Sequence, residues 1–114
     1  MTHEYTILTG GRVLATAETA ADSLAVPHPT AIAWAEDTVL AVGTDEAVLA
    51  VSRGDSRFHD LRGAVVRPVS GGARLEPGAA ADFAVLSAAP DSQGIRLRPI
   101  AVVRAGRVVA GALP

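Results

Sequence analysis

Histidine is the side chain that most readily supplies metal ligands and acid–base groups near neutral pH, and the chain of 114 residues contains three of them. His3 lies near the start of the sequence, His28 lies between two prolines, and His59 alternates with apolar residues. A catalytic metal site needs about three protein ligands that converge on one point. These scattered histidines are better explained as surface or locally hydrogen-bonded side chains. We therefore predict no metal site, no catalytic residue and no bound cofactor.

Paired carboxylates are a second arrangement that can support acid–base catalysis. Asp60 and Asp82 lie on either side of a glycine-rich segment and are the candidates for such a pair. The alternative, which we favour, is that Asp82 caps a turn and pairs with an arginine. The segment Ser70-Gly71-Gly72 lacks the lysine and the helix that a phosphate-binding loop requires. We interpret it as a connector.

Aromatic and basic side chains are the remaining candidates for ligand binding. Trp34 could stack on a ligand, but a place in the hydrophobic core or in an interface explains a single tryptophan better. All ten basic residues are arginines, nothing in their spacing indicates an anion-binding pair, and we expect them on a solvated surface. The arginines considered for an anion-binding pair are Arg62, Arg67, Arg74, Arg96, Arg98, Arg104 and Arg107.

Composition limits the class of protein. A chain of this length, with 49% apolar and 19% charged residues, is expected to fold as one globular domain. The absence of cysteine excludes disulfides, thiolate metal sites and a cysteine nucleophile. A net charge of −2 with dispersed arginines argues against a nucleic-acid partner. No apolar run is long enough to predict a membrane span or a signal peptide, so we expect a cytoplasmic protein without a membrane partner.

Short apolar runs separated by turn residues predict an all-β fold, a mostly antiparallel β-sandwich or small barrel with one short helix. Three hairpins are expected, over 5–15 about Gly10-Gly11, over 30–42 about Glu36-Asp37, and over 100–110 about Ala105-Gly106. Ile32 and Trp34 should share one face of their strand. Further strands are expected over 57–61, 64–66 and 82–86, the last after a turn at Pro77-Gly78, whereas 16–29 and 88–96 have the composition of loops.

The expected helix covers residues 44–51. Thr44 can cap its free N–H groups, and Asp45 and Glu46 suit the positive end of the helix dipole. Gly54 can supply the left-handed residue that ends a helix.

An ordered series of motifs resembles the segments that flank the catalytic barrel in the amidohydrolase family of metal-dependent hydrolases. In chain order these motifs are GRVL at 11–14, VLAVG at 39–43, DLRGAVVRP at 60–68, LEPGAAADFAVL at 75–86 and GRVV at 106–109. In that family the two flanking segments fold together into one β-sandwich, the composite domain, and a (β/α)₈ barrel of ~250 residues lies between them. The resemblance implies a single composite-type domain over 1–114, with the barrel missing at a junction near 67–76.

The departures from the family pattern determine the functional expectation. In the family, the proline that corresponds to Pro68 is followed by glycine, an apolar pair, aspartate and a metal-binding His-x-His pair, but here Val69-Ser70-Gly71-Gly72 follows. The other metal ligands come from barrel strands that this chain lacks. The resemblance therefore implies a non-catalytic structural or interaction module. A small-ligand-binding domain with a cleft near Trp34, or an accessory subunit of a split hydrolase, is the alternative.

Loss of the barrel also predicts association. Part of the sandwich is covered by the barrel in a complete enzyme, so its deletion would expose apolar surface to water. Monomeric proteins rarely tolerate a contiguous apolar patch larger than a few hundred Å². Burying such a patch would be worth several kcal/mol at ~25 cal/mol per Å². We therefore expect a homodimer or a protein partner.

Overall fold

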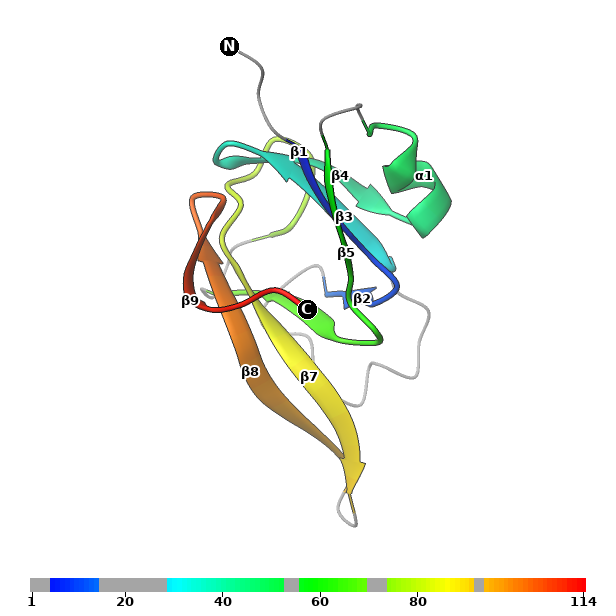
Figure 1. Cartoon of the computed structure of the whole chain (residues 1–114), viewed down its shortest axis with the longest axis vertical. Coiled ribbons are helices and arrows are strands. Elements are labelled where there is room, and N and C mark those ends of the chain that lie inside the picture. Colours follow the sequence, from blue (N-terminus) through cyan, green and yellow to red (C-terminus); the bar gives the residue numbers. More distant parts are fainter. Residues whose placement is uncertain (1–4, 15–28, 53–55, 70–73, 92–93) are drawn as a thin grey trace.

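The computed structural model describes residues 5–14, 29–52, 56–69, 74–91 and 94–114 (Figure 1). It confirms the expected mostly-β fold, with one short helix in the part of the chain that it describes. In chain order the elements are β1 (Tyr5–Thr9), β2 (Arg12–Val13), β3 (Ala31–Ala35), β4 (Thr38–Gly43), α1 (Asp45–Leu49), β5 (Arg57–Asp60), β6 (Val65–Pro68), β7 (Phe83–Asp91), β8 (Gly94–Arg104) and β9 (Arg107–Gly111).

The strands form two sheets. The first has four strands in the order β4-β3-β1-β5, and the second has five in the order β2-β6-β7-β8-β9. Most neighbours are antiparallel, but β1 pairs with β5 and β2 pairs with β6 in parallel. Both parallel pairs join the N-terminal strands to strands that lie some fifty residues later, which ties the start of the chain into both sheets.

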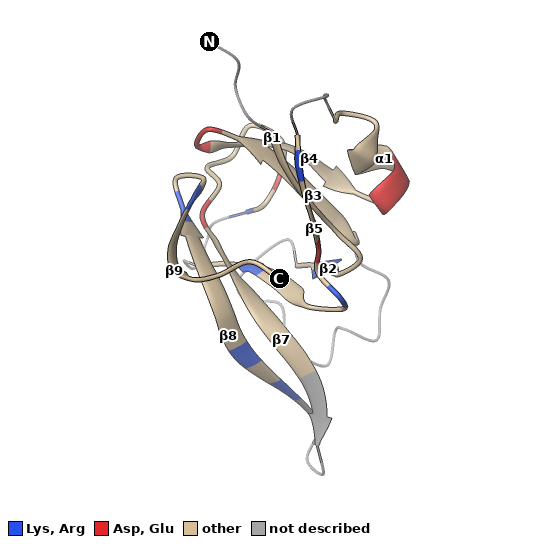
Figure 2. Ribbon diagram, viewed as in Figure 1, with Lys and Arg blue, Asp and Glu red and all other residues tan. Residues whose placement is uncertain are grey.

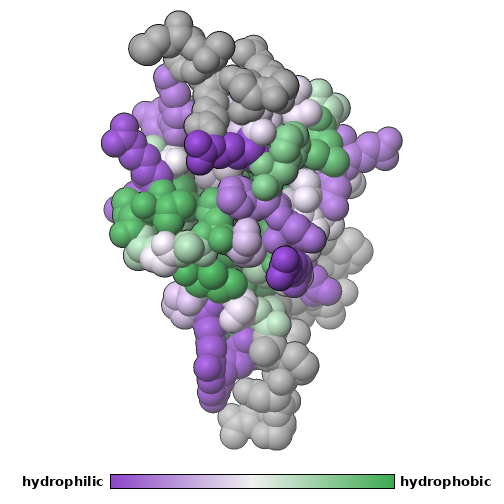
Figure 3. Space-filling view, viewed as in Figure 1, coloured by the Kyte–Doolittle hydropathy of each residue, from purple (hydrophilic) through white to green (hydrophobic). Residues whose placement is uncertain are grey.

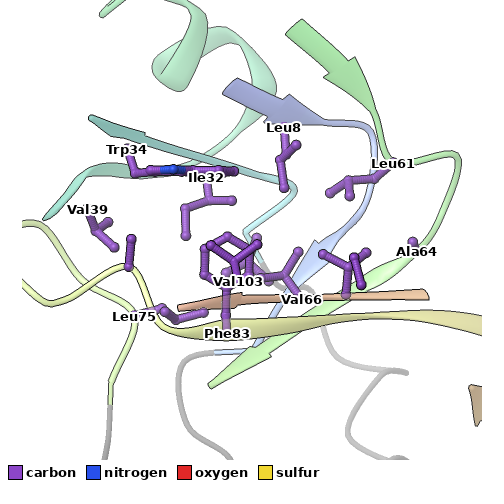
Figure 4. Packing of buried hydrophobic residues seen from close by; sticks show 14 residues of the cluster. Leu8, Ile32, Trp34, Val39, Leu61, Ala64, Val66, Leu75, Phe83 and Val103 are labelled. Carbon is purple, nitrogen blue, oxygen red and sulfur yellow. The ribbon is translucent and has the colours of Figure 1, made fainter. Parts of the chain in front are cut away.

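Apolar side chains from the two sheets meet in one core (Figure 4). Trp34 of β3 and Phe83 of β7 make its central aromatic contact, with ring centroids 5.1 Å apart and planes inclined at 75°. This edge-to-face geometry is favoured by the quadrupoles of the two rings. The cluster comprises Leu8, Val13, Ile32, Trp34, Val39, Leu61, Ala64, Val66, Leu75, Ala81, Phe83, Val85, Ala101 and Val103. Ile32 and Trp34 both belong to it, which confirms that they share a face.

The four-stranded sheet is buried on its other face as well. Val48 of α1 packs there against Ile7, Ala31 and Ala33. Because successive side chains of a strand point to opposite faces, Ile7 contacts the helix side while Leu8 enters the core between the sheets. The helix therefore covers one side of the first sheet, and the second sheet covers the other.

The first predicted hairpin is wrong. β1 and β2 follow each other around Gly10-Gly11, but they belong to different sheets and do not pair with each other. Gly10 has a φ of 73°, and a Cβ at the buried Gly11 would lie 2.5 Å from the Ala64 carbonyl oxygen. The two glycines thus allow the chain to cross tightly from one sheet to the other, where a hairpin would have kept both strands in one sheet.

The predicted loop over 88–96 is also wrong. β7 continues to Asp91 and β8 begins at Gly94, so the two strands extend as a long ribbon beyond the sandwich (Figure 1). Pro90 lies in β7 opposite Ile95. Beyond Leu86, which is the last β7 residue paired with β6, β7 is an edge strand among the described residues. Proline is tolerated at such an edge because its missing N–H faces no second neighbour.

The other two hairpins are confirmed. β3 and β4 are joined by Glu36-Asp37, and β8 and β9 by Ala105-Gly106, with positive φ at Glu36, Ala105 and Gly106. The turn before β7 is confirmed as well, with a φ of 91° at Gly78.

The helix is confirmed, with a shorter span than expected. Thr44 accepts a hydrogen bond from the Ala47 backbone N–H, as an N-cap does, and α1 ends at Leu49 with Ala50 as C-cap. The expectations for Gly54 and for most of the 16–29 loop lie outside the described residues.

Candidate functional site

Trp34 is a core residue whose ring is closed to ligands. Its side chain is 3% exposed, and its indole nitrogen donates a hydrogen bond of 3.0 Å to the Gly106 carbonyl oxygen. Because the indole is almost fully buried, packs against Phe83 and has its only donor occupied, it offers no surface on which a ligand could stack. The core role predicted for Trp34 is confirmed.

Asp82 holds a turn, as predicted. Its carboxylate accepts a hydrogen bond of 2.6 Å from the Ala105 backbone N–H, and the Gly106 N–H donates to the Ala81 carbonyl oxygen. The β8–β9 turn is therefore hydrogen-bonded both to the segment before β7 and to Trp34 of β3. The pairing of Asp82 with an arginine stays a prediction.

Asp60 has different partners. It ends β5, and its carboxylate accepts a hydrogen bond of 2.9 Å from the Arg62 backbone N–H next to Gly10. Asp60 therefore stabilises the turn between β5 and β6, whereas Asp82 stabilises the turn between β8 and β9. Each carboxylate accepts a backbone hydrogen bond in a different turn, and this arrangement does not support a shared acid–base pair.

Of the three histidines considered as metal ligands, His59 is the one that lies within the described residues. Its Nδ1 lies 3.1 Å from the Pro114 carbonyl oxygen, and the tautomer with a proton on Nδ1 donates a hydrogen bond there. No group of three or more metal-binding side chains lies together in the described part of the chain. His3, His28 and the segment 70–73 lie outside that part.

A structural role for Asp45 was missed by the sequence reasoning, which assigned it only to the helix dipole. Its carboxylate accepts hydrogen bonds from the Thr30 hydroxyl (2.7 Å) and from the Gly10 backbone N–H (3.1 Å). Asp45 thereby joins the first turn of α1 to the start of β3 and to the crossing between the sheets. The only signal in the sequence was an aspartate at the first position of a helix, which does not indicate Thr30 or Gly10 as hydrogen-bond partners.

Among the described residues, the basic and the acidic positions are each spread over several elements (Figure 2). Arginines lie along β8 and at the β8–β9 turn, while acidic residues mark the β3–β4 turn and the start of α1. In this view no continuous basic stripe follows any element. The predicted solvated role of the arginines agrees with this distribution.

Exposed apolar side chains are the distinctive feature of the surface. The described large apolar residues with the greatest exposure are Val109 (60%), Phe58 (55%), Val108 (42%) and Leu49 (41%). Two of them are neighbours on β9, and every residue of β9 is exposed. Figure 3 shows a hydrophobic region on the left of the view, where β9 lies in Figure 1. The edge formed by β9 is therefore the candidate functional site.

Comparison of the chain with protein-family models, curated proteins and solved structures gave no match. No helix in the described part of the structure is both long and apolar enough to cross a membrane.

Proposed function

We propose that the chain is a stand-alone composite-type domain, related to the sandwich domain of amidohydrolases, that acts as a non-catalytic interaction module. The observation that carries this proposal is the pairing of β6 with β7. Val65, Val66, Arg67 and Pro68 lie opposite Leu86, Val85, Ala84 and Phe83, on either side of the junction. The motif before the junction and the motif after it are thus adjacent strands of one sheet.

The division of the strands supports the same proposal. The segment before the junction supplies the whole first sheet together with β2 and β6, and the segment after it supplies β7, β8 and β9. Both segments contribute to the single core that holds Trp34 and Phe83. Two ends of a longer chain that already fold together need only a short connection when the intervening barrel is lost.

The side chains that remain favour an interaction role. The described residues include no buried polar or charged side chain, whereas catalytic sites depend on convergent polar groups. The surface instead offers exposed valines on an open strand. We propose a cytoplasmic protein that binds another protein chain, with a second copy of itself as the first partner to test.

The proposed function is tested by activity and by mass. The purified chain, supplemented with Zn²⁺ or Mn²⁺, is assayed against cyclic amides, linear amides and esters, and we expect no rate above the metal-only background. Light scattering over a concentration series is expected to give a mass above that of one chain. Metal-dependent hydrolysis that survives repurification would contradict the non-catalytic assignment.

A further inference from the structure

The edges of the two sheets differ in how open they are, and this difference identifies an interaction surface. An edge strand presents unpaired N–H and C=O groups that can pair with another chain. Folded proteins protect such edges by covering them, by keeping them short, or by placing charges and prolines on them. Each sheet of the sandwich ends in two edge strands.

The edges of the four-stranded sheet are protected. The start of β4 is covered by the segment before β7: the Gly78 N–H donates to the Val39 carbonyl oxygen, and the Val39 N–H donates to the Ala79 carbonyl oxygen. The β5 edge carries Arg57 and Asp60 at its two ends. Its third residue, His59, contacts Pro114.

Within the five-stranded sheet only β9 has a long apolar edge. β2 is two residues long. The part of β7 beyond Leu86 carries Pro90 and Asp91, and the outer part of β8 carries Arg96, Arg98 and Pro99. β9 has five residues, one charge and no proline, and both of its valines are exposed. Of the described edges, β9 is the one with two exposed large apolar side chains, although it also carries Arg107 and a bulge.

From this comparison we infer that β9 pairs antiparallel with β9 of a second copy, which joins the two five-stranded sheets across a two-fold axis. The inference rests on the proposed function and names the partner and the surface for it. An antiparallel pairing centred on Val109 places this residue opposite the partner's Val109. The bulge sets Val108 and Ala110 on opposite faces of the sheet, beside the consecutive β8 residues Val103 and Val102. Directly opposed side chains lie on the same face of a sheet, so the two Val109 side chains contact each other.

The charge pattern of β9 fits a second copy in this register. Arg107 lies opposite the partner's Gly111, where no cation opposes it. The two Arg107 side chains start roughly 13 Å apart along the joined strands, beyond a Debye length of about 10 Å at 0.1 M salt. The strand is therefore complementary to itself, as a two-fold interface requires.

The bulge in β9 limits the size of this interface. The register between β8 and β9 shifts where Val102 lies opposite Ala110 and Val103 lies opposite Val108, which leaves Val109 without a β8 partner. Bulges increase the local twist and shorten the stretch over which an edge can pair. Five paired residues bury less than the ~800 Å² per partner of a standard interface. The dimer should therefore dissociate on dilution.

Light scattering of the full chain over a concentration series, with matched variants, tests the inference. The wild-type mass should rise toward twice the 11.6 kDa of one chain. Val109→Lys would place two cations in direct opposition, and dissociation should become at least about tenfold easier. Phe58→Lys introduces the same charge at a similarly exposed apolar site on β5, and its mass should follow the wild type. Circular dichroism checks that both variants are folded.

Disulfide trapping tests the proposed register of the β9–β9 pair. It remains informative even if the Val109→Lys variant fails to fold. The chain has no cysteine, so a single introduced thiol can react only with its copy. Opposed Cα atoms in an antiparallel pair lie about 4.5–5.5 Å apart, within the range of a disulfide. Val109→Cys should form a covalent dimer on oxidation, whereas Arg107→Cys and Phe58→Cys should remain monomeric in denaturing electrophoresis.

The outcomes separate the inference from the proposed function. A dimer that Val109→Lys leaves intact, or Arg107→Cys cross-linking as fast as Val109→Cys, overturns β9 pairing and leaves the proposed self-association standing. A wild-type chain that stays monomeric at the highest concentration overturns both. In those cases the non-catalytic assignment would still stand, because only the hydrolase assay addresses it.

Discussion

The Trp34 indole nitrogen and the Gly106 carbonyl oxygen lie 3.0 Å apart and form a hydrogen bond between residues 72 positions apart in the sequence. The bond joins β3 of the first sheet to the turn between β8 and β9 of the second. The same turn is held by Asp82 through the Ala105 N–H and by Ala81 through the Gly106 N–H. The position of β9, and hence of its open edge, is fixed by these three contacts.

Trp34→Phe should destabilise the fold by about 1–3 kcal/mol, because it removes the indole donor and leaves a gap in the core. The change is measured as a lower urea midpoint with an unchanged slope. Thr38→Val is the control, since it removes an exposed hydrogen bond between the neighbours Thr38 and Asp37. That variant should change stability by less than about 0.5 kcal/mol. Equal losses in the two variants would show that the link to Gly106 contributes nothing.

Gly106→Ala should be far more damaging than Gly63→Ala. Both glycines have positive φ, 77° and 83°, so the backbone strain of an alanine should lower the free energy of unfolding by roughly 1–2 kcal/mol at either position. A Cβ at Gly106 would overlap the Glu36 carbonyl oxygen, whereas a Cβ at Gly63 would meet nothing within 4 Å. The difference between the two losses of stability, measured by thermal unfolding, therefore reports the close approach of the β8–β9 turn to the β3–β4 turn. Similar losses would contradict that approach.

Two of the three predicted hairpins could be read from the sequence because their turns are local. Two-residue loops at Glu36-Asp37 and Ala105-Gly106 fix both the turn and the strands that flank it. The core role of Trp34 was expected for a single tryptophan, and its shared face with Ile32 followed from alternation along the strand. The turn role of Asp82 was expected at the start of the strand predicted over 82–86.

The remaining features depend on partners that are distant in sequence. Nothing near Gly10-Gly11 indicates that β1 pairs with β3 while β2 pairs with β6. The long β7–β8 ribbon was missed because Pro90 and Gly94 normally interrupt strands that have neighbours on both sides. The contacts of Asp45 reach Gly10 and Thr30, which lie 35 and 15 residues away.

Phe83→Ala and Phe58→Ala form a matched pair, because these are the two phenylalanines of the chain. Phe83 is fully buried against Trp34, and Phe58 is 55% exposed. Removal of the buried ring should cost about 3–5 kcal/mol, a large part of the 5–15 kcal/mol that stabilises a typical domain. Removal of the exposed ring should cost less than about 1 kcal/mol. Urea unfolding monitored by Trp34 fluorescence measures both, and a severe loss in Phe58→Ala would place that ring in a buried contact.

Asp45→Ala should destabilise the chain by about 1–3 kcal/mol, because the Thr30 hydroxyl and the Gly10 N–H both lose their acceptor. Glu46→Ala is the matched control: it also removes one negative charge from the first turn of α1, but Glu46 is exposed. The shared loss of favourable interaction with the helix dipole is worth about 0.3–1 kcal/mol, so any excess in Asp45→Ala measures the hydrogen bonds. A double-mutant cycle with Thr30→Val should give a coupling of at least about 0.5 kcal/mol. Additive losses would mean that Asp45 stabilises the helix alone and does not hold it to the sheet crossing.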